Sequence, residues 1–327
     1  MAICPQGKIM DGIICIYKPK DYTSFDVVAI VRKLFKTRKV GHGGTLDPMA
    51  EGVLPVFLGA ATRAVDFQPE NDKEYVAGFR FGITTDTLDI TGQVTSYKEE
   101  YVSRNKMIFV ERYVGEIEQI PPMYSAVQVD GKRLYDLARK GIEVERKPRK
   151  VTINSIKVES YADNEGVMRV NCSKGTYIRT LIHDIGQDFG AGAVMTSLVR
   201  TKSGVFTLED CHQIDDLRKL ATREGTAGLR NLLKPADRLF ESYPKAQLDE
   251  TQTALFKNGV KLAADRIRFE RIYNGIYTVF GYDKTLLALA KIAEDHSFEA
   301  IQRFQTPEIV IDENRQEENG EFDEVDE

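Results

Sequence analysis

Apolar positions repeat along the chain, up to about residue 205, with the periods of strands and helices. Runs typical of strands occur at 12–18, 53–58, 74–83, 150–160, 166–173 and 193–200. Helical spacing occurs at 25–36, 103–116 and 176–189. Ser24 is the expected N-cap of the first helix and Gly190 the expected C-cap of the last. Pro55 inside the second strand predicts an edge strand or a bulge.

The remaining segments have other patterns. Residues 123–150 show few strand or helix periods and many basic side chains, so we expect a long excursion from the core. Residues 246–307 contain short alternating stretches, which predict a separate small unit of the β-barrel type. Residues 312–327 are acidic and poor in apolar side chains, which predicts a disordered tail.

The composition is that of a soluble globular protein, with 42% hydrophobic and 29% charged residues. No apolar run approaches membrane-spanning length, and the first residues lack the pattern of a signal peptide. The four cysteines are scattered, which predicts reduced thiols in a cytoplasmic protein. The four histidines form no ligand set, so we expect no metal.

The charge is unevenly distributed. The net charge is −5, but residues 312–327 hold nine acids and one base and so carry −8, which leaves +3 on the rest. Five bases and no acid lie within 32–39, and six bases with two acids lie within 139–150. Such patches suit a polyanionic partner, although a solvated surface is the plainer interpretation of either one.

The glycine-rich segment 41–50 contains the strongest candidate for chemistry, Asp47. A lone carboxylate on such a loop serves as a nucleophile or general base, and the alternative is an Asp-Pro turn that starts the next strand. The segment lacks the Lys-Ser or Lys-Thr of a nucleotide-triphosphate loop, and the chain has neither Cys-x-x-Cys nor His-x-Glu. A carboxylate mechanism without metal or cofactor remains.

Five motifs follow one another in the order of a known family. They are the opening at 12–24, the segment 41–56, the pair of segments 73–75 and 82–89, the segment 121–126 and the segment 174–179. Together they resemble the TruB family of tRNA pseudouridine synthases, collinearly over about residues 10–205. Gly43 departs from the family pattern, which usually has Thr there.

The resemblance implies roles for three catalytic residues. Asp47 would be the nucleophile that enables cleavage of the uridine N-glycosidic bond, by attack on C6 or on C1′. Arg179 would pair with Asp47 as a bidentate partner, and Tyr75 would stack on the flipped base. The plainer interpretations are a helix-surface base for Arg179 and an ordinary strand aromatic for Tyr75.

The resemblance also implies contacts with substrate and RNA. His42 would lie near the extruded base, with a neutral capping histidine as the alternative. Leu198 would form an apolar wall, with plain core as the alternative. Further contacts are expected from Lys18, Tyr177, Arg146, Lys147 and Arg149.

The fold that the resemblance implies is α+β, the pseudouridine synthase fold. We expect a mixed, largely antiparallel sheet with flanking helices and a central cleft in residues 1–240. Within it, 121–150 would be a thumb-like RNA-binding excursion, and 246–307 would be a PUA-like β-barrel.

The function that it implies is isomerisation of uridine to pseudouridine at position 55 in the T-loop of tRNA. The enzyme would be a cytoplasmic monomer that needs no cofactor, protein partner or membrane, and it would flip the base out of its stack. A catalytically idle RNA-binding or chaperone protein of the same fold is one alternative, which the intact Asp47, Tyr75 and Arg179 disfavour. A guide-RNA-dependent synthase is another, which the segment 121–150 disfavours.

Overall fold

A computed structural model describes residues 10–129 and 131–304 of the chain. It divides into two compact units, Met1–Ser242 and Tyr243–Glu327. The acidic tail expected at 312–327 lies outside the described residues. None of the helices in the described ranges is long and apolar enough to cross a membrane.

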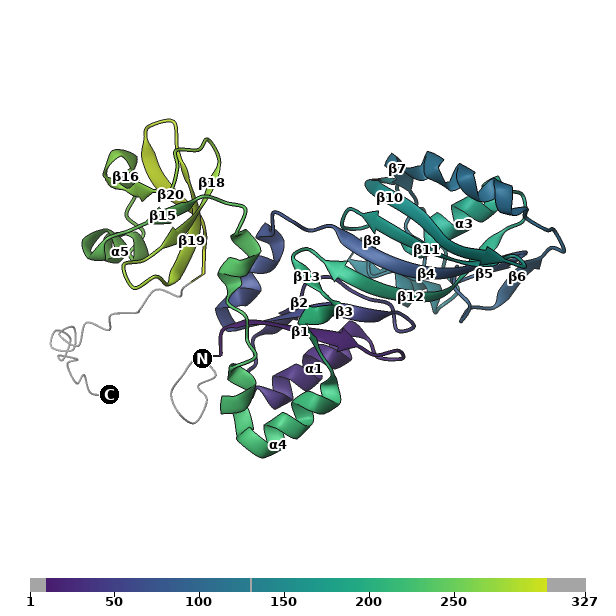
Figure 1. Ribbon diagram of the computed structural model, residues 1–327, viewed down its shortest axis with the longest axis horizontal. Coiled ribbons are helices and arrows are strands. Elements are labelled where there is room, and N and C mark those ends of the chain that lie inside the picture. The colour runs from purple at the N-terminus through teal and green to yellow at the C-terminus, as the bar shows by residue number, and fades with distance from the viewer. Residues whose placement is uncertain (1–9, 130, 305–327) are drawn as a thin grey trace, which may run out of the picture. The chain divides into compact units, whose positions relative to one another are not determined.

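The first unit is built on one large sheet (Figure 1). Its strands run in the order β14-β1-β3-β12-β4-β11-β10-β7, with β2 beside β3 and β13 beside β12. Only the pairs β1–β14 and β3–β12 are parallel, so the expected mixed, largely antiparallel sheet is confirmed. The strands are β1 Gly12–Lys18, β2 Val40–His42, β3 Glu51–Leu58, β4 Lys73–Phe81, β7 Gly115–Gln119, β10 Arg149–Ala162, β11 Glu165–Cys172, β12 Ala193–Ser203, β13 Phe206–Thr207 and β14 Cys211–His212.

Two small hairpins and several helices complete this unit. The hairpins are β5 Ile83–Thr85 with β6 Val94–Tyr97, and β8 Gln128–Val129 with β9 Lys132–Arg133. The α-helices are α1 Ser24–Leu34, α2 Leu134–Ala138, α3 Ile178–Asp188 and α4 Ile214–Arg230. The 3-10 helices are η1 Gly59–Phe67, η2 Arg104–Tyr113, η3 Leu208–Asp210 and η4 Ala236–Phe240.

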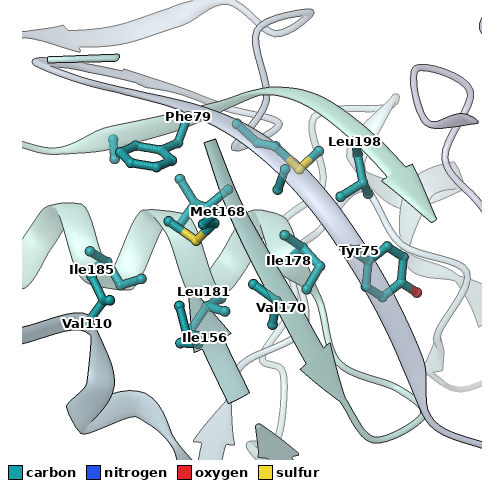
Figure 2. Close-up of a cluster of buried hydrophobic side chains, with 14 of the residues drawn as sticks. Tyr75, Phe79, Val110, Ile156, Met168, Val170, Ile178, Leu181, Ile185 and Leu198 are labelled. Atoms are coloured by element: carbon teal, nitrogen blue, oxygen red, sulfur yellow. The ribbon is translucent and has the colours of Figure 1, made fainter. Parts of the chain in front are cut away.

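Each half of the sheet has its own apolar core. Strands β1 and β3 pack against α1 and α4, which Figure 1 shows side by side. Strands β4, β10, β11 and β12 pack against α3 and η2. Figure 2 shows the second core, where Leu181 and Ile185 of α3 meet Met168 and Val170 of β11. The helices predicted at 25–36 and 176–189 are therefore amphipathic helices that bury their apolar face on the sheet.

Two local expectations were wrong, and one expected helix has the 3-10 form. The N-cap of α1 is Thr23, whose hydroxyl accepts the N–H of Asp26 in a capping box. The helix expected at 103–116 is the 3-10 helix η2, Arg104–Tyr113. Strand β3 is not an edge, because Pro55 pairs with Cys15 of β1. On its other side β3 pairs with β12 through Glu51 and Gly52 and with β2 from Val56 onward. Pro55 lies between these two paired stretches, so no ladder hydrogen bond requires the N–H that proline lacks.

The second unit is a curled six-stranded sheet in the order β16-β20-β19-β18-β15-β17. Its elements are β15 Lys245–Gln247, α5 Glu250–Lys257, β16 Leu262–Ala263, η5 Ala264–Arg266, β17 Arg268–Phe269, β18 Ile276–Phe280, β19 Leu286–Ile292 and β20 Ser297–Arg303. Its core contains Phe256 of α5, Tyr277 and Phe298. The short alternating stretches thus form a small β unit, to which α5 is an addition that the sequence pattern did not indicate.

Candidate active site

The loop that carries Asp47 lies where the two halves of the sheet meet. It connects β2 to β3, and only two register pairs join β3 to β12, Val199 with Glu51 and Arg200 with Gly52. Gly52 has φ +103°, and a Cβ there would lie 2.3 Å from the carbonyl oxygen of Arg200. Only glycine lets β12 approach this closely, so the end of the loop is fixed against the second half of the sheet.

Buried side chains from β1 and α1 hold the loop from behind. The hydroxyl of Ser24 accepts the N–H of Leu46 at 2.9 Å and donates to the Leu46 carbonyl at 3.3 Å. The ammonium of Lys18 donates to the carbonyls of Pro48 at 3.2 Å and of Tyr22 at 2.6 Å. These bonds tie the backbone on both sides of Asp47 to elements that are more than 20 residues away in the sequence.

Arg200 is a third support, which sequence reasoning missed. The residue is 1% exposed, and its guanidinium donates to the carbonyls of Gly44 at 3.1 Å, Thr45 at 3.4 Å and Val53 at 2.7 Å. No carboxylate of the described residues forms an ion pair with it. Backbone carbonyls therefore accept the hydrogen bonds of this buried cation. In the sequence Arg200 is one base in a strand, and nothing in its neighbourhood indicates that it turns inward.

Arg179 brings Asp47 together with a second carboxylate. It projects from the first turn of α3 with 3% exposure, and its Nε lies 2.9 Å from Oδ2 of Asp47. Its Nη1 lies 3.6 Å from Oδ2 of Asp89 and donates to the carbonyl of Thr87 at 2.8 Å. Its Nη2 donates to the carbonyl of Tyr124 at 2.8 Å.

The expected bidentate geometry was wrong, because the hydrogen bonds of Arg179 go to the carbonyls of Thr87 and Tyr124 and none goes to Asp47. Among the described residues its Nε makes no aligned hydrogen bond, so the contact with Asp47 is an ion pair only. The side chain of Asp47 is 32% exposed, against 4% for Arg179. One oxygen of Asp47 is thus paired and aimed while the carboxylate stays accessible to a substrate atom.

Asp89, which sequence reasoning did not single out, anchors the inner end of this network. It is 4% exposed, and its Oδ1 accepts the hydroxyl of Thr87 at 2.9 Å and the N–H of Thr91 at 3.0 Å. Leu88 before it has φ +63°, a left-handed conformation that is costly for a branched side chain. The strained turn aims both Asp89 and the Thr87 carbonyl at Arg179.

Tyr75 and Leu198 lie beside the loop as part of the core (Figure 2). Tyr75 is 8% exposed and pairs in register with Arg200 across β4 and β12. Burial raises the pKa of its hydroxyl, and the charge of Arg200 opposes this rise. Leu198 is 6% exposed and packs in the same cluster, with Leu46 of the loop. Both residues thus belong to the apolar cluster that contains Leu46, the residue before Asp47.

His42 ends strand β2, and Gly43 starts the loop. The Nδ1 of His42 accepts the N–H of Gly44 at 3.3 Å, and burial, with Arg200 nearby, lowers the pKa of the imidazole. His42 thus acts as a neutral cap for the N–H of Gly44, and this role does not exclude the expected contact with RNA. A Cβ at Gly43 would lie 3.0 Å from the ring of Phe57, so the aromatic ring fills the space that a threonine would use.

The other predicted contact residues lie in different surroundings. Lys18 is fully buried, and desolvation lowers the pKa of its ammonium to about 8, so its placement favours support of the loop. Tyr177 caps α3, and its backbone exchanges two hydrogen bonds with the side chain of Gln119. Arg146 donates to the carbonyl of Pro121, whereas Lys147 and Arg149 are exposed.

Two family models match this chain. The TruB family pseudouridylate synthase N-terminal domain matches residues 32–178, and the tRNA pseudouridylate synthase B C-terminal domain matches residues 179–241. The matches thus cover Asp47, Tyr75 and Asp89 in one domain and Arg179 and Arg200 in the other. Neither match extends into the unit that starts at Tyr243.

Relatives and solved structures agree with these matches. A tRNA pseudouridine synthase B from Clostridium tetani is 44% identical over 84% of this chain and 93% of its own length. One from Clostridium perfringens is 42% identical over 86% and 95%. A Cbf5–Nop10–Gar1 complex contains a chain with 29% identity and a TM-score of 0.70, over 93% of this chain and 90% of that one. The chain belongs to the TruB family of pseudouridylate synthases.

Proposed function

We propose that this isomerase acts on the uridine at position 55 in the T-loop of tRNA, with Asp47 as the nucleophile. Curated relatives that match most of the chain are tRNA pseudouridine synthases B. The observation that carries the proposal is the ion pair between Asp47 and the buried Arg179, at 2.9 Å, on a loop that three other side chains hold in place.

The chemistry needs no co-reactant. The bond between N1 of the base and C1′ of the ribose breaks, the base turns, and a bond forms between C5 and C1′. The proton lost from C5 is balanced by the one gained at N1, so substrate and product are isomers. Asp47 attacks C6 or C1′, and Arg179 pairs with one carboxylate oxygen and so orients the nucleophile.

The target uridine has to leave its stack to reach Asp47, at a cost of a few kcal/mol. We assign the holding of the RNA during this step to the excursion 121–150, whose Lys147 and Arg149 are exposed. Arg179 bonds to the carbonyl of Tyr124 at the start of this excursion, which links RNA contact to the nucleophile's partner. We assign the unit from Tyr243 onward to RNA affinity as a PUA-like domain, since every residue of the network above precedes it.

A guide-dependent synthase remains the second candidate, since the chain also resembles Cbf5 of a Cbf5–Nop10–Gar1 complex. The two differ in what the isolated chain can do. We favour the standalone type because the chain carries the excursion 121–150. We favour the cytoplasm because the thiols of Cys15, Cys172 and Cys211 are free, as in a reducing compartment.

Tritium release from an unmodified tRNA transcript labelled at C5 of uridine tests the proposal. The purified chain alone should release tritium from one position, 55, without a guide RNA. Asp47→Asn should release none while it binds tRNA as the wild type does, because the change keeps size and removes the nucleophile. Asp66→Asn, at an exposed acid of η1, is the control and should keep full activity. Turnover by Asp47→Asn would refute the role of Asp47, and activity only with a guide would favour the second candidate.

A further inference from the structure

An exposed aromatic ring stands beside the catalytic loop. Phe25, in the first turn of α1, is 58% exposed, although the residue before it is buried. That neighbour, Ser24, is the residue that bonds to both backbone groups of Leu46. The capping box of Thr23 and Asp26 fixes the same turn. Phe25 is therefore held in a set position relative to Asp47 rather than on a mobile loop.

The ring has the imidazole of His42 on one side. The two ring centres are 5.8 Å apart, at 86°, an edge-to-face contact. Because Nδ1 of His42 accepts the N–H of Gly44, its Nε2 carries the proton in the neutral ring. A lowered pKa keeps this imidazole neutral at physiological pH. It can thus contact a base without adding charge.

A guanidinium also lies close to this ring. Arg133 of the β8–β9 hairpin has its Cζ 5.9 Å from the centre of the Phe25 ring and donates to the hydroxyl of Tyr135 at 3.1 Å. Arg139 lies 5.6 Å from the Tyr135 ring. Aromatic and guanidinium groups thus alternate from the catalytic loop onto the excursion 121–150. Of the acids nearby, Asp26 accepts both the N–H and the hydroxyl of Thr23, and Asp136 lies near Arg133.

A single exposed phenylalanine needs no explanation, but this arrangement does. Unpaired nucleotide bases are bound by stacking on aromatic rings and on guanidinium planes, with cations for the phosphates. We propose that Phe25, with His42 and Arg133 close to its ring, is a stacking site for one unpaired base of the substrate RNA beside the target uridine. This proposal rests on the proposed function for the identity of the RNA.

Affinity measurements with abasic RNA test the site directly. The full-length chain is titrated with RNA hairpins that carry the target loop and have one loop nucleotide at a time replaced by an abasic one. With the wild type, one abasic position beside the target should weaken binding about 5- to 150-fold, the effect of losing one stacked base. Phe25→Ala should weaken binding of the intact hairpin to the same extent and make that abasic substitution ineffective.

Two substitutions at Phe25 distinguish stacking on a flat ring from contact with any apolar side chain, and a third substitution, elsewhere, is the control. Phe25→Tyr should keep wild-type affinity, whereas Phe25→Leu, apolar but not flat, should behave as the alanine variant. Phe109→Ala removes a ring of η2 that is 59% exposed and should change nothing. Wild-type affinity in Phe25→Ala, or full affinity in Phe25→Leu, would overturn the proposal. If the wild type forms no pseudouridine yet shows the abasic effect, the proposed function fails and the stacking site stands.

Discussion

Replacing Arg200 by lysine should show whether the catalytic loop depends on the hydrogen bonds of the guanidinium or only on its positive charge. The guanidinium spans three carbonyls in different directions, those of Val53, Gly44 and Thr45. An ammonium keeps the positive charge but places all of its donors on one atom, so it cannot reproduce the planar fork. We expect Arg200→Lys to keep one of these bonds and to release the carbonyls of the loop.

The cost can be estimated from these bonds. A hydrogen bond to a charged donor contributes about 1.5–3 kcal/mol, and the bond to Thr45, at 3.4 Å, counts for little. With one bond kept, one strong bond is lost, and the free energy of unfolding should fall by about 1.5–3 kcal/mol. Displacement of a reacting group by about 1 Å costs about 100-fold in rate. The rate of the chemical step should fall to that extent, equivalent to about 2.7 kcal/mol of activation free energy.

The assay is single-turnover pseudouridine formation at saturating enzyme, together with tRNA affinity and urea unfolding. Because Arg200 is 1% exposed, tRNA affinity should stay at the wild-type value while the rate falls. Arg238→Lys is the matched control, since Arg238 is paired with Asp210 in the same unit. A wild-type rate in Arg200→Lys would show that the guanidinium does not place the loop. An equal loss of affinity would show instead that Arg200 contacts RNA.

Three further predictions concern the same unit. Burial lowers the pKa of Lys73 to about 7, below its unfolded value, so the folded state binds fewer protons and wild-type stability should rise between about pH 7 and pH 10. Lys73→Met should be more stable than the wild type in urea, by more at about pH 7 than at about pH 9, and an equal gain at both would contradict this. Gly43→Thr should lower activity because it presses on the Phe57 ring, and Gly43→Thr with Phe57→Leu should recover it; failure of the pair to recover would mean that the ring is not the obstacle. Arg149→Gln should make the slope of log affinity against log salt shallower by about 0.7–0.9 for each phosphate that the variant no longer neutralises, and an unchanged slope would show that this side chain does not touch RNA.

Local pattern predicted the elements of the first unit because their burial is periodic. The strand that carries Tyr75 and the helix that carries Arg179 were both found from apolar spacing, since each buries one face on the sheet. The helix expected at 103–116 has the 3-10 form, which apolar residues at three- and four-residue spacing do not distinguish from an α-helix. The N-cap was misplaced by one residue because Thr23 and Ser24 are adjacent and both able to cap.

Only part of the site was predictable from the sequence. Motif resemblance found Asp47 and Arg179, which the structure places 2.9 Å apart, although they are far apart in sequence. It did not reveal Asp89 or Arg200, because their functions depend on partners in other elements. Asp89 is linked to the site by its ion pair with Arg179. Arg200 is linked to it by hydrogen bonds to the carbonyls of a loop that precedes it by about 150 residues.

The supports of the loop explain why a carboxylate in an irregular segment can be aimed. A loop of this kind has few backbone bonds of its own, so its carbonyls and N–H groups need partners elsewhere. Lys18, Ser24 and Arg200 supply them from β1, α1 and β12, which belong to both halves of the sheet. Asp47 therefore depends on the relative position of the two halves as much as on its own turn. Substitutions at that junction should lower the rate without touching substrate, and no motif confined to the loop can show this dependence.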